Sequence, residues 1–366
     1  MHDSRAPGPP PHCPNERCVF HCAAAPGWRW VRAGFFHRDA PPHQVQRFRC
    51  VHCGRYFSAQ TFRTDYWLRR PELLLPTFHR LVGCSALRQI AREFAASPQT
   101  IALHGARLGR HCQLFHERFR PQGPFSEPLV LDSFQSFELS QYHPTLFHCV
   151  VEKDSHFILG FTDSEMRRSG SMSAKQKRRR AELEREFGRP DPRSVQREVA
   201  RVLRIVAPEP QAIELHSDEH QDYPRALKEL THLSVDHHTL SSRAARTSHN
   251  PLFAINRLDL LVRHSGANHK RETIAFSKRR QGAAERLWLF VVWRNYVKWF
   301  SERNHGETPA MRARVCEHRW SVKQILSRRL FPTRIGLPER WQQYYWRRTP
   351  TRRIPNVRTH QLRYAF

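Results

Sequence analysis

Two short apolar runs, each leading into an aspartate, constrain the fold of this chain more than any other feature. Asp132 closes the run Leu129–Leu131, and Asp218 follows the run Ile213–Leu215 after two residues. Runs of this length and composition predict buried strands. We therefore expect both carboxylates at strand ends, where they could share a divalent cation. A turn former or helix cap is the other common use of an aspartate at a strand end.

The order of the predicted elements brings the two aspartates into one sheet. Strands are expected at 129–137, 145–151, 157–161, 213–215 and 233–240, and helices at 173–206 with a break at 188–192, at 223–230, at 252–263 and at 284–300. Three successive strands followed by alternating helices and strands is the order of an RNase H-like fold, an α/β fold with a mixed sheet. In that fold the first and fourth strands are neighbours, so Asp132 and Asp218 would lie side by side.

A third carboxylate is expected on the helix that follows the fifth strand. Asp259 is best positioned, with Asn256 one turn before it and Arg263 one turn after it on the same side. Glu272 is the principal rival and Glu285 a more distant one. An aspartate on an amphipathic helix is also typical of a solvated face, so the third position stays open.

The net charge of the chain restricts its partner. The 366 residues carry 61 Lys and Arg against 33 Asp and Glu, which gives a formal net charge of +28. Such an excess favours a polyanion, bound through phosphate contacts that weaken with salt. No apolar run approaches the roughly 20 residues of a bilayer span, and no secretory signal is visible, so we expect a cytosolic protein without membrane contact.

Paired cysteines predict a zinc ribbon over residues 1–60. Two close pairs are separated by about thirty residues: Cys13 with Cys18, and Cys50 with Cys53. Four thiolates on two tight turns suit a tetrahedral structural zinc. Three nearby residues could replace one ligand: His21, Cys22 and His52. Free buried thiols without a metal are the alternative.

Residues 61–120 carry the pattern of a helix-turn-helix. Apolar positions at helical spacing predict helices at 74–81 and 85–94, and Ser97 with Pro98 then provides an N-cap and a first helical position. The helix that starts there would present four residues to a DNA major groove: Gln99, Thr100, His104 and Arg107. A helical hairpin that serves only packing is the alternative.

Taken together, these motifs resemble those of bacterial insertion-sequence transposases of the DDE type, similar to the insertion-sequence-one group. The likeness covers nearly the whole chain and rests on five segments besides the helix-turn-helix: Arg47–Ser58, Leu131–Ser133, Ser217–Glu219, Asn256–Asp259 and Arg271–Lys278. That group carries Glu and, three residues later, Asn on the helix of the third acid. Here Asn256 precedes Asp259, so the acid is displaced by one turn.

The resemblance implies a DNA transposase that acts on double-stranded element ends and target DNA, as a homo-oligomer in the bacterial nucleoid. Three carboxylates would hold two Mg²⁺ or Mn²⁺ ions for hydrolysis and strand transfer: Asp132, Asp218 and Asp259. Its domains would be the zinc ribbon (1–60), the helix-turn-helix (61–120), the RNase H-like domain (121–300) with a solvated charged insertion (173–207), and a basic, phosphate-binding extension (301–366). A decayed copy that acts as a DNA-binding regulator and a metal-dependent nuclease are the alternatives.

Overall fold

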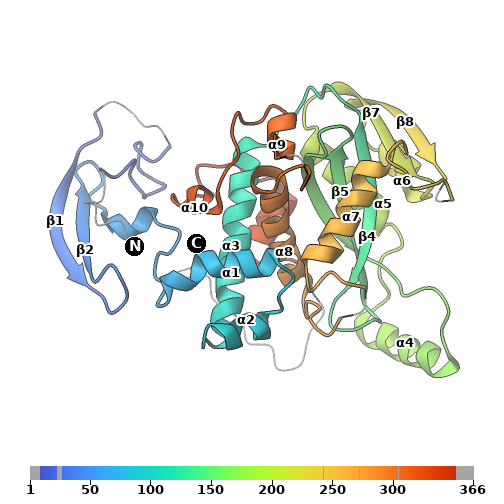
Figure 1. The fold of residues 1–366 in the computed structure, drawn as a ribbon, viewed down its shortest axis with the longest axis horizontal. Helices are drawn as coiled ribbons and strands as arrows, with labels where there is room; N and C mark the ends of the chain where they lie inside the picture. Colours follow the sequence, from blue (N-terminus) through green and yellow to red (C-terminus); the bar gives the residue numbers. More distant parts are fainter. Residues whose placement is uncertain (1–8, 23–26, 242, 272, 304, 352–366) are drawn as a thin grey trace.

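A computed structural model describes residues 9–22, 27–241, 243–271, 273–303 and 305–351. A small antiparallel sheet forms one end of the molecule (Figure 1), with strands in the order β1 (Trp30–His37), β2 (Gln44–Cys50) and β3 (Tyr56–Ser58). Phe48 and Phe57 pack here with three buried cysteines in a core that is separate from the main one. This module contains the predicted cysteine pairs.

A long helix runs through the middle of the molecule (Figure 1). Three helices follow the small sheet: α1 (Leu74–Val82), α2 (Leu87–Glu93) and α3 (Pro98–Phe119). Ser97 starts α3 as predicted, because its Oγ accepts a hydrogen bond from the Thr100 backbone N–H at 3.0 Å. The helix continues for 22 residues, well beyond the four positions predicted to face DNA, and packs along α8 (Arg280–Val292) inside the main core.

The five predicted strands form one mixed sheet. Its spatial order is β6 (Ile158–Glu165), β5 (Pro144–Glu152), β4 (Leu129–Phe137), β7 (Gln211–Asp218) and β8 (Leu233–Leu240). The first three strands of the sequence pair antiparallel, whereas β4, β7 and β8 run parallel. The sequence expectation that the first strand is central and lies beside the fourth is therefore confirmed.

Four helices lie between and after the strands. They are α4 (Ala174–Phe187), α5 (Ser194–Val206), α6 (Asp222–Leu227) and α7 (Phe253–Ser265). The predicted insertion at 173–207 is wrong in its extent, because α5 packs on β5 and β6 and buries Val199 and Leu203 completely. Only α4 projects from the body (Figure 1), with Leu183 as its single buried residue.

The C-terminal region is also more ordered than predicted. A π-helical turn, Trp293–Val297, follows α8, and three short helices come after it: α9 (Pro309–Arg312), α10 (Val322–Ile325) and α11 (Glu339–Tyr345). Trp341 is fully buried and donates from Nε1 to the Phe161 carbonyl at 2.9 Å. The expectation of a loose basic extension from 301 onward is thus wrong for the part that the structure describes, because its aromatic residues complete the main core. Residues 352–366 lie outside the described residues.

Candidate functional site

The two cysteine pairs converge at one end of the small sheet. The ligand atoms of Cys13, Cys18, Cys50 and Cys53 all lie within 4.8 Å of one another, and the sulfurs of Cys13 and Cys53 are 3.6 Å apart. Four sulfurs around a zinc ion at about 2.3 Å would be separated by about 3.8 Å. Both knuckles are closed by backbone turns, and Gly54 provides the positive φ of +70° that the second turn requires. The group can therefore hold a structural zinc ion.

The surroundings of the four sulfurs support this interpretation. Trp28 donates from Nε1 to the Cys50 sulfur at 3.3 Å, which is the kind of hydrogen bond that orients a thiolate ligand. The alternative ligand His21 is occupied elsewhere, since its ring nitrogens contact the Cys13 carbonyl and the Thr333 hydroxyl. Cys22 is exposed and forms no part of the group.

The predicted DNA-recognition helix is wrong for two of its four residues. His104 and Arg107 are only 2% and 8% exposed, because this part of α3 is covered by α1, α8 and the turn before α1. Arg107 donates from Nη1 to the carbonyls of Thr64, at 3.1 Å, and Tyr66. It therefore holds a turn of its own chain and does not face solvent.

The other two residues lie on the first turn of α3. Gln99 is exposed and Thr100 is half-buried. Contact of Gln99 and Thr100 with DNA stays a prediction.

Asp132 and Asp218 lie at matching positions of neighbouring parallel strands. Leu131 pairs with Ser217, and the two aspartates are the next residue on each strand. Asp218 is the last residue of β7 as predicted, but Asp132 is the fourth residue of β4 and not its end. The reason is that β4 continues into a hairpin with β5, which pairs residues as far as Phe137.

Burial and neighbouring carboxylates control the charge of Asp132. Desolvation is the largest effect, and the negative charges of Asp218 and Asp259 add to it, so the pKa of Asp132 is raised to about 7. The Ser133 backbone N–H donates to Asp132 Oδ1 at 2.6 Å, and this bond together with Arg246 opposes the rise. A carboxyl group whose pKa is raised close to neutral pH in this way is typical of functional sites.

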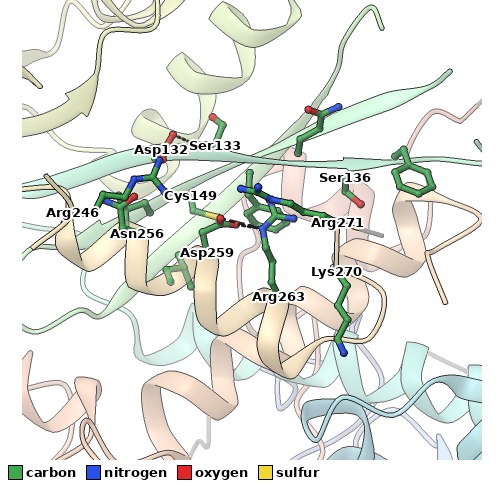
Figure 2. A pocket seen from close by; sticks show the side chains of 15 residues that line it. Asp132, Ser133, Ser136, Cys149, Arg246, Asn256, Asp259, Arg263, Lys270 and Arg271 are labelled. Carbon is green, nitrogen blue, oxygen red and sulfur yellow. Dashed lines mark hydrogen bonds and ion pairs between the residues drawn. The ribbon is translucent and has the colours of Figure 1, made fainter. Parts of the chain in front are cut away.

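Asp259 faces the same cavity from α7. The cavity has a volume of about 550 Å³ and is lined by both Asp132 and Asp259 (Figure 2). Arg263, one turn along the helix, donates from Nε to both oxygens of Asp259 at 2.9 and 3.1 Å. Within the described ranges the four cysteines are the only group of three or more metal-ligating residues that meets within 4.8 Å, so the three carboxylates are more widely spaced than the sulfurs.

The structure gives different information on the two other candidates for the third acid, Glu272 and Glu285. Glu272 lies outside the described residues. Glu285 is 5% exposed on α8, where it pairs with Arg347 at 2.9 Å, so it is not part of this cavity.

Several residues of the cavity were missed by sequence reasoning. Arg246, from the loop after β8, and Arg271, after α7, line the cavity (Figure 2), and Arg271 points toward Asp259 whereas Lys270 points away. Arg271 begins one of the segments that carry the family resemblance, but no sequence signal assigns it or Arg246 to this cavity, because the chain has 61 Lys and Arg. Together with Arg263 and Lys270, they outnumber the two aspartates that line the cavity, Asp132 and Asp259.

A hydrogen-bonded network lies behind Asp132. Ser133 Oγ is 2.6 Å from His148 Nδ1 and 3.0 Å from the Tyr223 hydroxyl, and His148 Nε2 is 2.8 Å from Ser164 Oγ. Burial lowers the pKa of His148 to about 3, so the ring is neutral and can donate from one nitrogen while it accepts at the other. This network fixes the strand position next to Asp132.

Comparisons with known proteins give little further information. No protein-family model and no curated protein matches the chain. Among solved structures, it is similar to a chain of a simian T-cell lymphotropic virus intasome in complex with PP2A regulatory subunit B56 gamma. The identity is 14%, the match covers 67% of this chain and 71% of that chain, and the TM-score is 0.23. A likeness at that TM-score carries no argument about fold or function.

None of the helices in the described ranges combines the length and the apolar character that a bilayer crossing needs.

Proposed function

We propose that this chain is a metal-dependent enzyme that cuts and joins DNA, of the DDE transposase type. The observation that carries the proposal is the pairing of Leu131 with Ser217, because it makes Asp218 the neighbour of Asp132 on the adjacent strand. Asp132 lines the cavity together with Asp259, whereas Asp218 lies outside its lining. Two carboxylates that approach one another while partly buried repel, and a divalent cation relieves this repulsion.

The topology of the sheet supports an RNase H-like domain. The strand order β6-β5-β4-β7-β8, with an antiparallel half and a parallel half, is the arrangement that this fold requires. The third acid of such a domain comes from a helix packed on the central strands, and α7 packs on β4 and β5. Asp259 is therefore our candidate for the third position.

The chain's own residues would position the DNA and the metal ions. Asp132, deprotonated on metal binding, would hold the metal ions together with Asp218 and Asp259. Bound Mg²⁺ or Mn²⁺ would supply an activated water or 3′-hydroxyl and would stabilise the leaving oxygen. Arg246 and Arg271 would hold phosphate oxygens across the cavity through charge-assisted hydrogen bonds. No covalent bond between protein and DNA is required.

The N-terminal module would contribute binding and not chemistry. Cys13, Cys18, Cys50 and Cys53 would hold one structural Zn²⁺, with no ligand position left open for a substrate. Double-stranded element ends and target DNA would be the partners, and two or more copies of the chain would act together on them.

A cleavage assay tests this proposal. Purified protein is incubated with Mg²⁺ and DNA that carries the inverted repeats flanking its gene, and nicked and joined strands are counted. We expect both products for the wild type and neither for Asp132→Asn or Asp218→Asn. A wild type that binds this DNA but breaks no strand in Mg²⁺ or Mn²⁺ would contradict the proposal, and breakage without joining would indicate a nuclease.

A DNA-binding regulator without cleavage activity is the second candidate. The ion pair between Asp259 and Arg263 favours it, because a carboxylate engaged by a guanidinium is a weaker metal ligand. Arg263→Gln separates the two candidates. It would leave an inactive regulator inactive, whereas in an enzyme it would free Asp259 and shift the dependence of cleavage on Mg²⁺ concentration.

A further inference from the structure

A second and larger cavity separates the small N-terminal sheet from the turn that precedes α1. Its volume is about 1280 Å³, and it shares no lining residue with the cavity around Asp132. Arg47 and Tyr56 line it from β2 and β3, and Trp67 and Arg69 line it from the turn. We call this cavity the N-terminal groove.

Trp67 is presented to solvent by a strained turn. Its side chain is 60% exposed, and its backbone φ is +59°, a conformation that costs a bulky residue energy. An exposed tryptophan in such a conformation persists only where the surrounding structure fixes it, which is typical of binding sites.

Two arginines fix the turn. Arg38 donates from Nη2 to the Leu68 carbonyl at 2.7 Å, and the buried Arg107 donates to the carbonyls of Thr64 and Tyr66. The buried guanidinium of Arg107 thus holds the backbone before Trp67, and the half-buried Arg38 holds the backbone after it. This is the role that the structure gives to Arg107 in place of the base contact predicted from the sequence.

The opposite wall carries a second exposed ring. Tyr56 is 53% exposed on β3, and the guanidinium carbons of Arg47 and Arg49 lie 5.5 and 5.7 Å from its ring centre. The alternation of Arg47, buried Phe48 and Arg49 along β2 puts both cations on the face of the sheet that carries Tyr56.

The groove is strongly positive. Six arginines line it against two acids, Asp39 and Glu72, and Glu72 is already paired with Arg70. Positive charge combined with exposed rings is the composition of sites that track a phosphate backbone and stack unpaired bases. A protein partner would need a matching excess of acid, and a duplex keeps its base faces stacked and out of reach of the rings.

We propose that the N-terminal groove binds single-stranded DNA, with unpaired bases stacked on Trp67 and Tyr56 and phosphates on Arg47, Arg55 and Arg69. The inference rests on the proposed function in taking DNA as the substrate, and it adds that the protein holds DNA whose strands are separated. Frayed or melted DNA near a cleavage point is the form that offers such bases.

Equilibrium binding of the full chain, measured by fluorescence anisotropy without added divalent cations, tests the proposal. The probes are a labelled oligodeoxythymidylate of about 20 nucleotides and a blunt duplex of the same length. Trp67→Ala should weaken binding of the oligodeoxythymidylate about tenfold, the value of one base stack, and leave the duplex within about twofold. Trp67→Phe should restore most of the loss.

Two matched controls come from the same module. Phe35 is 54% exposed but does not line the groove, so Phe35→Ala should bind both probes as the wild type does. Arg69→Gln should lower the slope of log K against log salt for the single strand by about 0.7, and Arg32→Gln, outside the groove, should lower it less. The proposal would be overturned if Trp67→Ala and Phe35→Ala weakened binding of the oligodeoxythymidylate equally. It would also be overturned if Trp67→Ala weakened binding of the single strand and of the duplex equally.

Photocrosslinking of the wild type removes any dependence on how the variants fold. An oligodeoxythymidylate that carries 5-iododeoxyuridine should crosslink to Trp67 or Tyr56, and crosslinks confined to other residues would overturn the proposal. Cleavage in Mg²⁺ is scored separately. A protein that stacks single strands on Trp67 but never cuts DNA would contradict the proposed function and leave the groove assignment intact.

Discussion

Asp132 is stabilised in its protonated form by the folded chain. Its pKa rises from 3.8 to about 7 through burial and the charges of Asp218 and Asp259. The folded state therefore binds the proton more tightly than the unfolded state does, so the ionised carboxylate lowers the stability of the fold as pH rises from about 4 to 7. This is a cost in stability that a catalytic metal site would explain.

The variant Asp132→Asn should remove that cost. We expect its free energy of unfolding to exceed that of the wild type, and the difference to grow by about 2–3 kcal/mol between pH 5 and pH 8. Thermal or denaturant unfolding without added divalent cations measures it. Asp236→Asn is the control, because the Asp236 side chain is 76% exposed on β8 and should show no such growth. A constant difference for Asp132→Asn across this pH range would refute the explanation.

Sequence reasoning at the residue scale succeeded where a side chain follows a regular apolar run. Asp132 and Asp218 were found because the strands before them are short, apolar and bounded. Arg107 was misassigned, because a basic residue after a predicted turn looks the same whether it faces DNA or a backbone carbonyl. Which of the two Arg107 contacts depends on the turn at Thr64–Leu68, more than 30 residues earlier in the chain. The periodicity of apolar residues within one helix gives no information about such a distant segment.

At the scale of elements, the packing of α3 on α8 depends on one glycine. A Cβ at Gly109 would lie 2.4 Å from the Glu285 carbonyl oxygen on α8, so no side chain fits while the two helices keep their distance. Close backbone approach of this kind explains why a helix with a weak amphipathic pattern is buried over most of its length.

Gly109→Ala should therefore destabilise the protein by roughly 1–3 kcal/mol, the usual range for overpacking, despite the better helix propensity of alanine. Gly282 on α8 provides the matched control, since nothing lies within 4 Å of a Cβ built there. Gly282→Ala should stabilise by about 0.5–1 kcal/mol. Chemical denaturation of the two variants measures both effects, and a stabilising Gly109→Ala would show that the helices are farther apart than described.

Elements were predictable where they form a short bounded apolar run or carry one apolar face. All five strands of the main sheet and α7 were found within a few residues of their observed bounds. The break between α4 and α5 agrees with the predicted one at 188–192, whereas the burial of α5 could not be predicted, because charge runs through both segments and only the spacing of Val199 and Leu203 distinguishes the buried helix. The C-terminal helices were missed because each is shorter than two turns and they are stable only against the core.

At the scale of the whole molecule, we expect the N-terminal module to depend on a bound metal ion for its stability. Its core consists of five buried residues, three of them cysteines, whereas the main core extends from Leu73 to Tyr345. So small a core does not offset the chain entropy of folding by itself. The metal would supply the missing free energy.

Cys50→Ser should therefore abolish zinc binding and make residues up to about 60 sensitive to protease, while the main body stays folded. Cys22→Ser is the control, because Cys22 is exposed and outside the four-sulfur group. Zinc content and limited proteolysis measure the outcome. Zinc bound by Cys50→Ser as tightly as by the wild type would contradict the assigned ligand set.

The most direct test of the proposed catalytic site changes the ligand chemistry of one carboxylate. Asp218→Cys replaces a hard oxygen ligand by sulfur, which binds Mg²⁺ poorly but accepts softer Mn²⁺. We predict that DNA cleavage by Asp218→Cys is lost in Mg²⁺ and returns in Mn²⁺, whereas Asp218→Ser stays inactive in both. Cleavage by Asp218→Cys that equals the wild type in Mg²⁺, or cleavage by Asp218→Ser in either ion, would show that Asp218 does not bind the catalytic metal.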